Sequence, residues 1–186
     1  RETAQRSRAL VAVKPPIFLT STWAFLTAQE GKKTFEVIAG LRKPSAGEKP
    51  GLIYSRFNNP NPQIAEERLS LWDNAEDCAI FSSGMAAITV SLLSVVRPGD
   101  MVLFSEPLYG GTDKFMKTFL PAFGVETRGL GPNQFPNLSL EESNRVRVIY
   151  LETPANPTND LFDIGLWSKI AKQMSKVLVM VDNTFL

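Results

Sequence analysis

Short apolar runs alternate with amphipathic segments over residues 62–186. The runs VRVIYLE (146–152) and VLVMVD (177–182) are almost continuously apolar, which is typical of strands in a sheet with helices on both faces. This alternation predicts an α/β fold with a mainly parallel sheet flanked by helices. The predicted strands are 78–83, 101–106, 125–130, 146–152 and 177–182, and the predicted helices between them are 85–96, 114–123 and 164–174.

The first 61 residues differ in character. They are rich in loop-forming residues and predict one short helix around 32–41. Residues 1–14 are interpreted as an N-terminal arm rather than a targeting peptide, because they lack a sufficiently long apolar run. A helix is predicted over 62–77, with Asn61 as its cap and Pro62 in its first turn. We therefore expect an N-terminal arm and loop segment over 1–61, followed by an α/β domain over 62–186.

Composition excludes several classes of protein. Of the 186 residues, 44% are hydrophobic and 21% are charged, which is ordinary for a globular domain and excludes a disordered or fibrous chain. A net charge of +1 gives no reason to expect a nucleic-acid or membrane-surface partner. The absence of histidine argues against hydrolase triads and histidine-bearing metal sites. The single Cys78 and the lack of any apolar run near ~20 residues predict a cytoplasmic protein.

Candidate chemistry lies just after the predicted strands, because open parallel sheets bind ligands beyond their carboxyl ends. The turn Ser83-Gly84-Met85 leads into a helix whose free N–H groups suit a phosphate, although an ordinary tight turn is the alternative. Asp182 ends an apolar strand and needs a hydrogen-bonding or cationic partner there, or else it caps a turn. Tyr109 precedes two glycines and offers an aromatic face to a flat ligand, or simply packs within its loop.

Five short motifs follow one another along residues 15–186, and their order is informative. They are YSRFNNPN (54–61), SSGMAA (82–87), LYGGT (108–112), ETPANPT (152–158) and VDNTF (181–185). Together they resemble the trans-sulfuration family of pyridoxal 5′-phosphate (PLP) enzymes, which includes cystathionine γ-synthase, the cystathionine lyases, methionine γ-lyase and the O-acyl-homoserine sulfhydrylases. The resemblance implies the large domain of a fold type I, aspartate-aminotransferase-like PLP enzyme. It also implies β- or γ-elimination, or γ-replacement, on cystathionine, an O-acyl-homoserine or a related amino acid.

The same resemblance implies how the cofactor is held. The turn at Ser83, with the backbone amides of Gly84 and Met85, binds the phosphate. Tyr109 stacks on the pyridine ring and places its hydroxyl near the substrate amino group, which makes it the catalytic candidate in this chain. Asp182 binds the ring nitrogen and keeps it protonated, since a nearby carboxylate raises the pKa of that nitrogen.

Further roles follow from the resemblance. Asn156 contacts the ring-oxygen side of the cofactor, and Glu152 and Lys114 are candidates for the substrate-binding wall. Tyr54 and Arg56 reach the phosphate of a neighbouring subunit's cofactor. The catalytic unit is then a homodimer, which we expect to assemble into a homotetramer.

Departures from the family pattern are also informative. The lysine that bonds to the cofactor lies in a Ser-x-Thr-Lys segment in this family, and no such segment occurs here. We therefore expect the chain alone to be inactive, as a fragment of an enzyme; the alternative is a non-catalytic paralogue or assembly subunit. Gly111 stands where methionine γ-lyases usually carry Cys, which argues against that member of the family. Residues 129–135 (GLGPNQF) imitate a dinucleotide fingerprint that Pro132 interrupts, which argues against a nucleotide-binding oxidoreductase.

Overall fold

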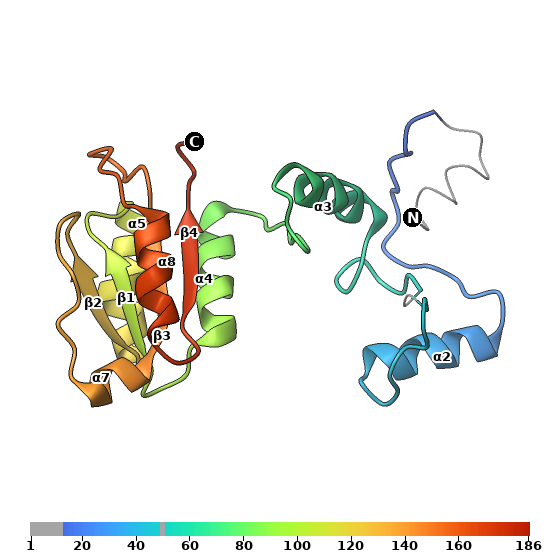
Figure 1. The fold of residues 1–186 in the computed structure, drawn as a ribbon. Coiled ribbons are helices and arrows are strands. Elements are labelled where there is room, and N and C mark those ends of the chain that lie inside the picture. The colour runs from blue at the N-terminus through green and yellow to red at the C-terminus, as the bar shows by residue number, and fades with distance from the viewer. Residues whose placement is uncertain (1–12, 49–50) are drawn as a thin grey trace. The chain divides into compact units, whose positions relative to one another are not determined.

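The computed structural model describes residues 13–48 and 51–186, which form two compact units that divide after Ile80 (Figure 1). This division lies beyond the expected boundary at 61/62, because helix α3 (Pro60–Trp72) belongs to the first unit. The predicted N-terminal arm falls almost entirely outside the described residues. None of the helices in the described parts of the chain has the length and apolar character needed to cross a membrane.

The second unit is built on a parallel four-stranded sheet with the strand order β2-β1-β3-β4. Its strands are β1 (Met101–Ser105), β2 (Glu126–Leu130), β3 (Val146–Glu152) and β4 (Leu178–Asp182). The parallel sheet and four of the predicted strands are thus confirmed. The fifth prediction, a strand over 78–83, is wrong: this segment is irregular, because no neighbouring strand in the described chain offers it the hydrogen bonds that a strand requires.

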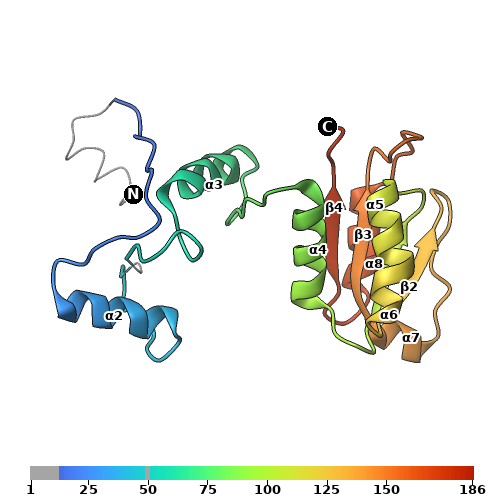
Figure 2. The same cartoon turned by 180° about the vertical axis from the view of Figure 1, so that it is seen from behind.

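Helices cover both faces of this sheet (Figures 1 and 2). One face is covered by α4 (Gly84–Val95) and by a helical segment made of α5 (Gly110–Lys114), the π-helix η1 (Phe115–Phe119) and α6 (Leu120–Ala122). The other face is covered by α8 (Ile164–Lys172). These elements confirm the three predicted helices of this region within a few residues. A further helix, α7 (Leu140–Arg145), was not predicted.

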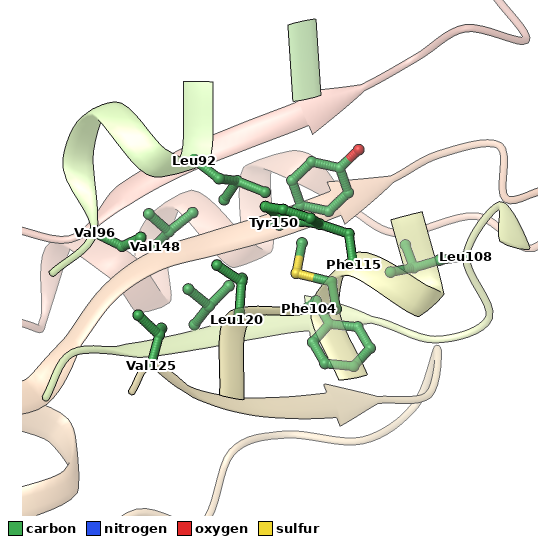
Figure 3. Packing of buried hydrophobic residues seen from close by; sticks show 11 residues of the cluster. Leu92, Val96, Phe104, Leu108, Phe115, Leu120, Val125, Val148 and Tyr150 are labelled. Carbon is green, nitrogen blue, oxygen red and sulfur yellow. The ribbon is translucent and has the colours of Figure 1, made fainter. Parts of the chain in front are cut away.

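Side-chain alternation along the central strands divides the core into two clusters. Val102 and Phe104 of β1 join Val148 and Tyr150 of β3 in the cluster under α4 and α5, which Figure 3 shows from close by. The intervening residues of the same strands face the α8 side. Successive strand residues point to opposite faces of a sheet, so the Tyr150 side chain lies on the face covered by α4.

The first unit contains α2 (Ala28–Ile38) and α3. The start of α3 corrects the sequence-based prediction: Asn59 is the N-cap and Pro60 is in the first turn. Asn61 instead bonds to the backbone of Phe18, accepting from its N–H and donating to its carbonyl oxygen, each at 2.9 Å. Two Asn-Pro pairs stand in tandem here, and the first of them begins the helix.

The segment that follows α2 contains an ion pair between Arg42 and Glu48. The Arg42 guanidinium donates to both carboxylate oxygens of Glu48, at 2.8 and 2.7 Å, and the Ser45 N–H donates to the same carboxylate at 2.8 Å. The hydrogen bonds from Arg42, followed by the one from Ser45, lower the pKa of Glu48 to about 2. This two-pronged contact orders a stretch that is rich in glycine, proline and lysine.

Candidate functional site

Three polar side chains gather at the carboxyl edge of β3 and β4. Glu152 and Asp182 are register partners at the ends of these strands, and Tyr150 lies two residues before Glu152. Residues two apart on a strand, and register partners on parallel neighbours, share one face of a sheet. All three side chains therefore lie on the face covered by α4 and α5.

The Asp182 carboxylate is held by three donors. The Tyr150 hydroxyl donates to Oδ2 at 2.9 Å, while the N–H and hydroxyl of Thr184 donate to Oδ1 at 3.1 and 2.6 Å. A carboxylate offers about four acceptor positions, so about one remains, on Oδ2. Tyr150 is 3% exposed; burial, followed by the Asp182 charge, raises the pKa of its phenol, so the hydroxyl stays a neutral donor.

Glu152 fastens two loops to each other at this edge. Both of its carboxylate oxygens accept from the Tyr109 N–H, at 3.0 Å each, and Oε1 also accepts from the Asn156 N–H at 2.8 Å. The Glu152 N–H donates to the Ser105 hydroxyl at 2.8 Å. Glu152 is 4% exposed, and these backbone donors compensate a buried charge. Its predicted place in the substrate wall stays a prediction.

Tyr109 precedes α5, with its side chain half exposed. The ring lies close to Gly111, where an added Cβ would be 2.7 Å from Tyr109 Cε1 and 2.9 Å from Met85 Sδ. The buried Thr112 hydroxyl donates to the same sulfur atom at 3.9 Å. The starts of α4 and α5 thus meet at Gly111, where a Cβ would require the Tyr109 ring or the Met85 side chain to shift.

The turn into α4 leaves backbone donors open. Ser83 is the N-cap, and its hydroxyl accepts from the Ala86 N–H at 3.1 Å. The N–H groups of Gly84 and Met85 precede the first hydrogen bond within the helix. A Cβ placed on Gly84 would meet no atom within 4 Å, so there is open space beside this residue. Such a site suits an anion.

The structure divides the predicted site residues between the two units. Together in the second unit are Ser83, Gly84, Met85, Tyr109, Lys114, Glu152, Asn156 and Asp182. Lys114 is exposed at the end of α5. Tyr54 and Arg56 belong to the first unit, where the guanidinium carbon of Arg56 lies 5.4 Å from the centre of the Tyr54 ring.

Sequence reasoning missed one member of the site. Tyr150 lies within an apolar run, where an aromatic residue is expected to serve packing alone. The available signal was its phenol group, since a buried hydroxyl usually has a hydrogen-bond partner.

The residues of the second unit fit PLP. A carboxylate with an acceptor position left suits a protonated ring nitrogen, a half-exposed aromatic ring suits a flat ligand, and open N–H groups at a helix start suit a phosphate. These features are supplied by Asp182, Tyr109 and the Gly84–Met85 turn respectively.

Comparison with known proteins gives a consistent result. The profile of the family described as Cys/Met metabolism PLP-dependent enzyme matches residues 1–186. An L-methionine γ-lyase of Pseudomonas deceptionensis is 35% identical over 94% of this chain, and a homocysteine/cysteine synthase of Saccharomyces cerevisiae is 34% identical over 99%. The chain spans 41% and 38% of the lengths of these two relatives.

A solved structure from Campylobacter jejuni has the same fold. It is described as an O-acetylhomoserine (thiol)-lyase that contains a pyridoxyl-lysine phosphate. The two structures superpose with a TM-score of 0.78 at 25% identity, over 92% of this chain and 40% of that one.

Proposed function

Because the chain belongs to the Cys/Met metabolism family of PLP-dependent enzymes, we propose that it forms the N-terminal part of the cofactor-binding domain of an enzyme of sulfur amino-acid metabolism. The proposed reaction is β- or γ-elimination, or γ-replacement, on methionine, cystathionine, an O-acyl-homoserine or a related amino acid. The observation that supports this most strongly is the Asp182 carboxylate, which is held by three donors and keeps an acceptor position at the sheet edge.

The chain's own residues divide the work of holding the cofactor. PLP, when bound, supplies a ring that accepts electrons from bonds at the α-carbon of an amino acid. Asp182 accepts a hydrogen bond from the ring N–H, and its charge favours the protonated nitrogen. The N–H groups of Gly84 and Met85 hold the phosphate. Tyr109 lies against the ring and presents its hydroxyl to the substrate amino group.

Residues around this centre orient the cofactor and the substrate. Asn156 contacts the ring-oxygen side, and Glu152 borders the substrate while holding the Tyr109 backbone. Lys114 supplies an exposed positive charge for the distal part of the substrate; an ammonium group binds a carboxylate as a point charge, without the paired hydrogen bonds of a guanidinium.

A second subunit completes each site in this proposal. Tyr54 and Arg56 reach the phosphate of the partner's cofactor, because a guanidinium binds phosphate through two parallel hydrogen bonds. The catalytic unit is then a homodimer, within a homotetramer. The lysine that bonds to the cofactor lies outside these 186 residues, since none of their lysines stands in a Ser-x-Thr-Lys segment.

The test is an assay of the full-length protein that contains this chain. Purified with PLP, it should release a 2-oxo acid and ammonia from L-methionine or cystathionine, or replace the acyl group of an O-acyl-homoserine by a thiol. Asp182→Asn should retain PLP and lower kcat by about a hundredfold. The control Asp73→Asn, at the exposed end of α3, should retain PLP and leave kcat unchanged. PLP binding without turnover of any of these amino acids would instead indicate the non-catalytic subunit.

A further inference from the structure

Tyr150 is a buried residue of β3 whose hydroxyl donates a hydrogen bond to the Asp182 carboxylate. We propose that Tyr150 is a positioning residue of the cofactor site, whose hydroxyl fixes the Asp182 carboxylate for its bond to the ring nitrogen. This inference rests on the proposed function, because it concerns the same carboxylate. It assigns a task to a residue that the family resemblance left without one.

The Tyr150 ring provides a fixed anchor. It is 3% exposed and packs in the cluster that contains Leu92, Phe115 and Val148. Figure 3 shows its hydroxyl pointing away from the other labelled side chains. Protein interiors are close-packed, so a ring enclosed in this way holds its hydroxyl in one place.

Asp182 needs such an anchor. It is the last residue of β4, which lies at one edge of the sheet formed by the described residues and pairs there with β3. Its carboxylate is only partly buried. The two bonds from Thr184 come from the turn that directly follows the strand, whereas the bond from Tyr150 comes from the neighbouring strand. Tyr150 therefore ties the carboxylate to the core.

The bond joins the Asp182 carboxylate to a neutral donor. Hydrogen bonds to charged groups are among the stronger ones in proteins. Burial keeps the Tyr150 phenol protonated by raising its pKa. Near this bond lie the Thr184 hydroxyl, the Glu152 carboxylate on the adjacent strand and the Thr112 side chain, which also contacts the Tyr150 hydroxyl. Tyr150 thus supplies a neutral donor to Oδ2 of Asp182 from the buried side of the strand pair.

A double-mutant cycle on PLP affinity tests this role. The dissociation constant of PLP is measured for the apo form of the full-length protein, for Tyr150→Phe, for Asp182→Asn and for the double variant. Tyr150→Phe removes the hydroxyl and keeps the packed ring. We expect it to weaken PLP binding about tenfold in the wild-type background and less than twofold in the Asp182→Asn background, if the effect of the hydroxyl on PLP passes through Asp182.

The control is Thr127→Val in β2, which removes a hydroxyl that donates to the Met116 carbonyl oxygen, at 3.0 Å, and should leave PLP affinity unchanged. An equal loss from Tyr150→Phe in both backgrounds would show that the hydroxyl acts independently of Asp182 and would overturn the inference. Unchanged affinity in the wild-type background would overturn it as well. Wild-type protein that binds no PLP would contradict the proposed function itself, and this inference with it.

Discussion

Both carboxylate oxygens of Glu152 lie 3.0 Å from the backbone nitrogen of Tyr109. A buried charge at the end of β3 thus holds the loop after β1, and the Asn156 N–H adds a third contact at 2.8 Å. The position of the Tyr109 ring therefore depends on Glu152, whose carboxylate binds the backbone N–H groups of the two loops.

We expect Glu152→Gln to loosen this loop. The substituted side chain keeps its size, but one acceptor oxygen becomes an NH₂ group that faces backbone donors, so at least one charge-assisted bond is lost. Hydrogen exchange at the Tyr109 and Asn156 amides of the full-length protein should become about tenfold faster. Glu141→Gln, at an exposed position of α7, is the matched control and should change neither rate. Unaltered exchange in Glu152→Gln would show that the loop is held by other contacts.

Two adjacent glycines provide a second test of the site. An added Cβ at Gly111 would lie 2.7 Å from the Tyr109 ring and 2.9 Å from Met85 Sδ, whereas one at Gly110 would meet no atom within 4 Å. Gly111→Ala should therefore displace the ring and weaken PLP binding by about tenfold, because contacts below van der Waals distance force side chains to shift. Gly110→Ala should stay within about twofold of wild type. Titration of the apo-protein with PLP measures both, and equal affinities would place the ring away from the cofactor.

Mixed dimers test whether Arg56 acts across subunits. Arg56→Ala and Asp182→Asn homodimers of the full-length protein should both have little activity. If Arg56 serves the partner's cofactor, one site of each mixed dimer has a complete set of groups, and the mixed dimer should recover about half of wild-type activity. If Arg56 serves its own subunit, every site lacks one group. Absence of recovery, with subunit exchange demonstrated by mass spectrometry, would therefore exclude the role in trans.

The stability that Glu142 contributes at the start of α7 should decrease as the pH falls. Glu142 accepts from Arg128 and from the Ser139 N–H, and these bonds lower its pKa to about 2. A carboxylate with a lowered pKa in the folded state contributes stability above its unfolded pKa and loses it as the pH falls toward the folded value. Glu142→Gln should therefore lower Tm at pH 6, and the difference from wild type should shrink between pH 4.5 and about 2. A difference that is independent of pH would show that the carboxylate charge is not involved.

The parts of the fold that the sequence predicted best are those with a continuous apolar signal. The run 146–152 became β3 with the same bounds, since a strand covered on both faces leaves little ambiguity. Helix α7 carries no apolar stripe; its signal was the capping pair Ser139 and Glu142, three residues apart. The segment 78–83 has the composition of a strand, but composition alone does not supply a neighbouring strand.

The candidate site was predictable at its proposed ligand contacts and less so where its residues contact one another. Asp182 ends β4 and Tyr109 lies in the loop after β1, at the edge where parallel sheets place ligand-binding residues, whereas the Gly84–Met85 turn begins α4. Tyr150 lies inside a strand, and its contact with Asp182 depends on the register between β3 and β4. This register cannot be read from the sequence. The same register makes Glu152 and Asp182 neighbours.

Nuclear magnetic resonance of PLP labelled with ¹⁵N at the ring tests the central claim most directly. In the wild-type full-length protein the chemical shift should be that of a protonated pyridine nitrogen, because the Asp182 carboxylate lies beside it. In Asp182→Asn, with PLP still bound, the shift should move to that of the unprotonated nitrogen. A nitrogen that stays protonated in Asp182→Asn, or that is unprotonated in the wild type, would contradict the placement of the cofactor at the end of β4.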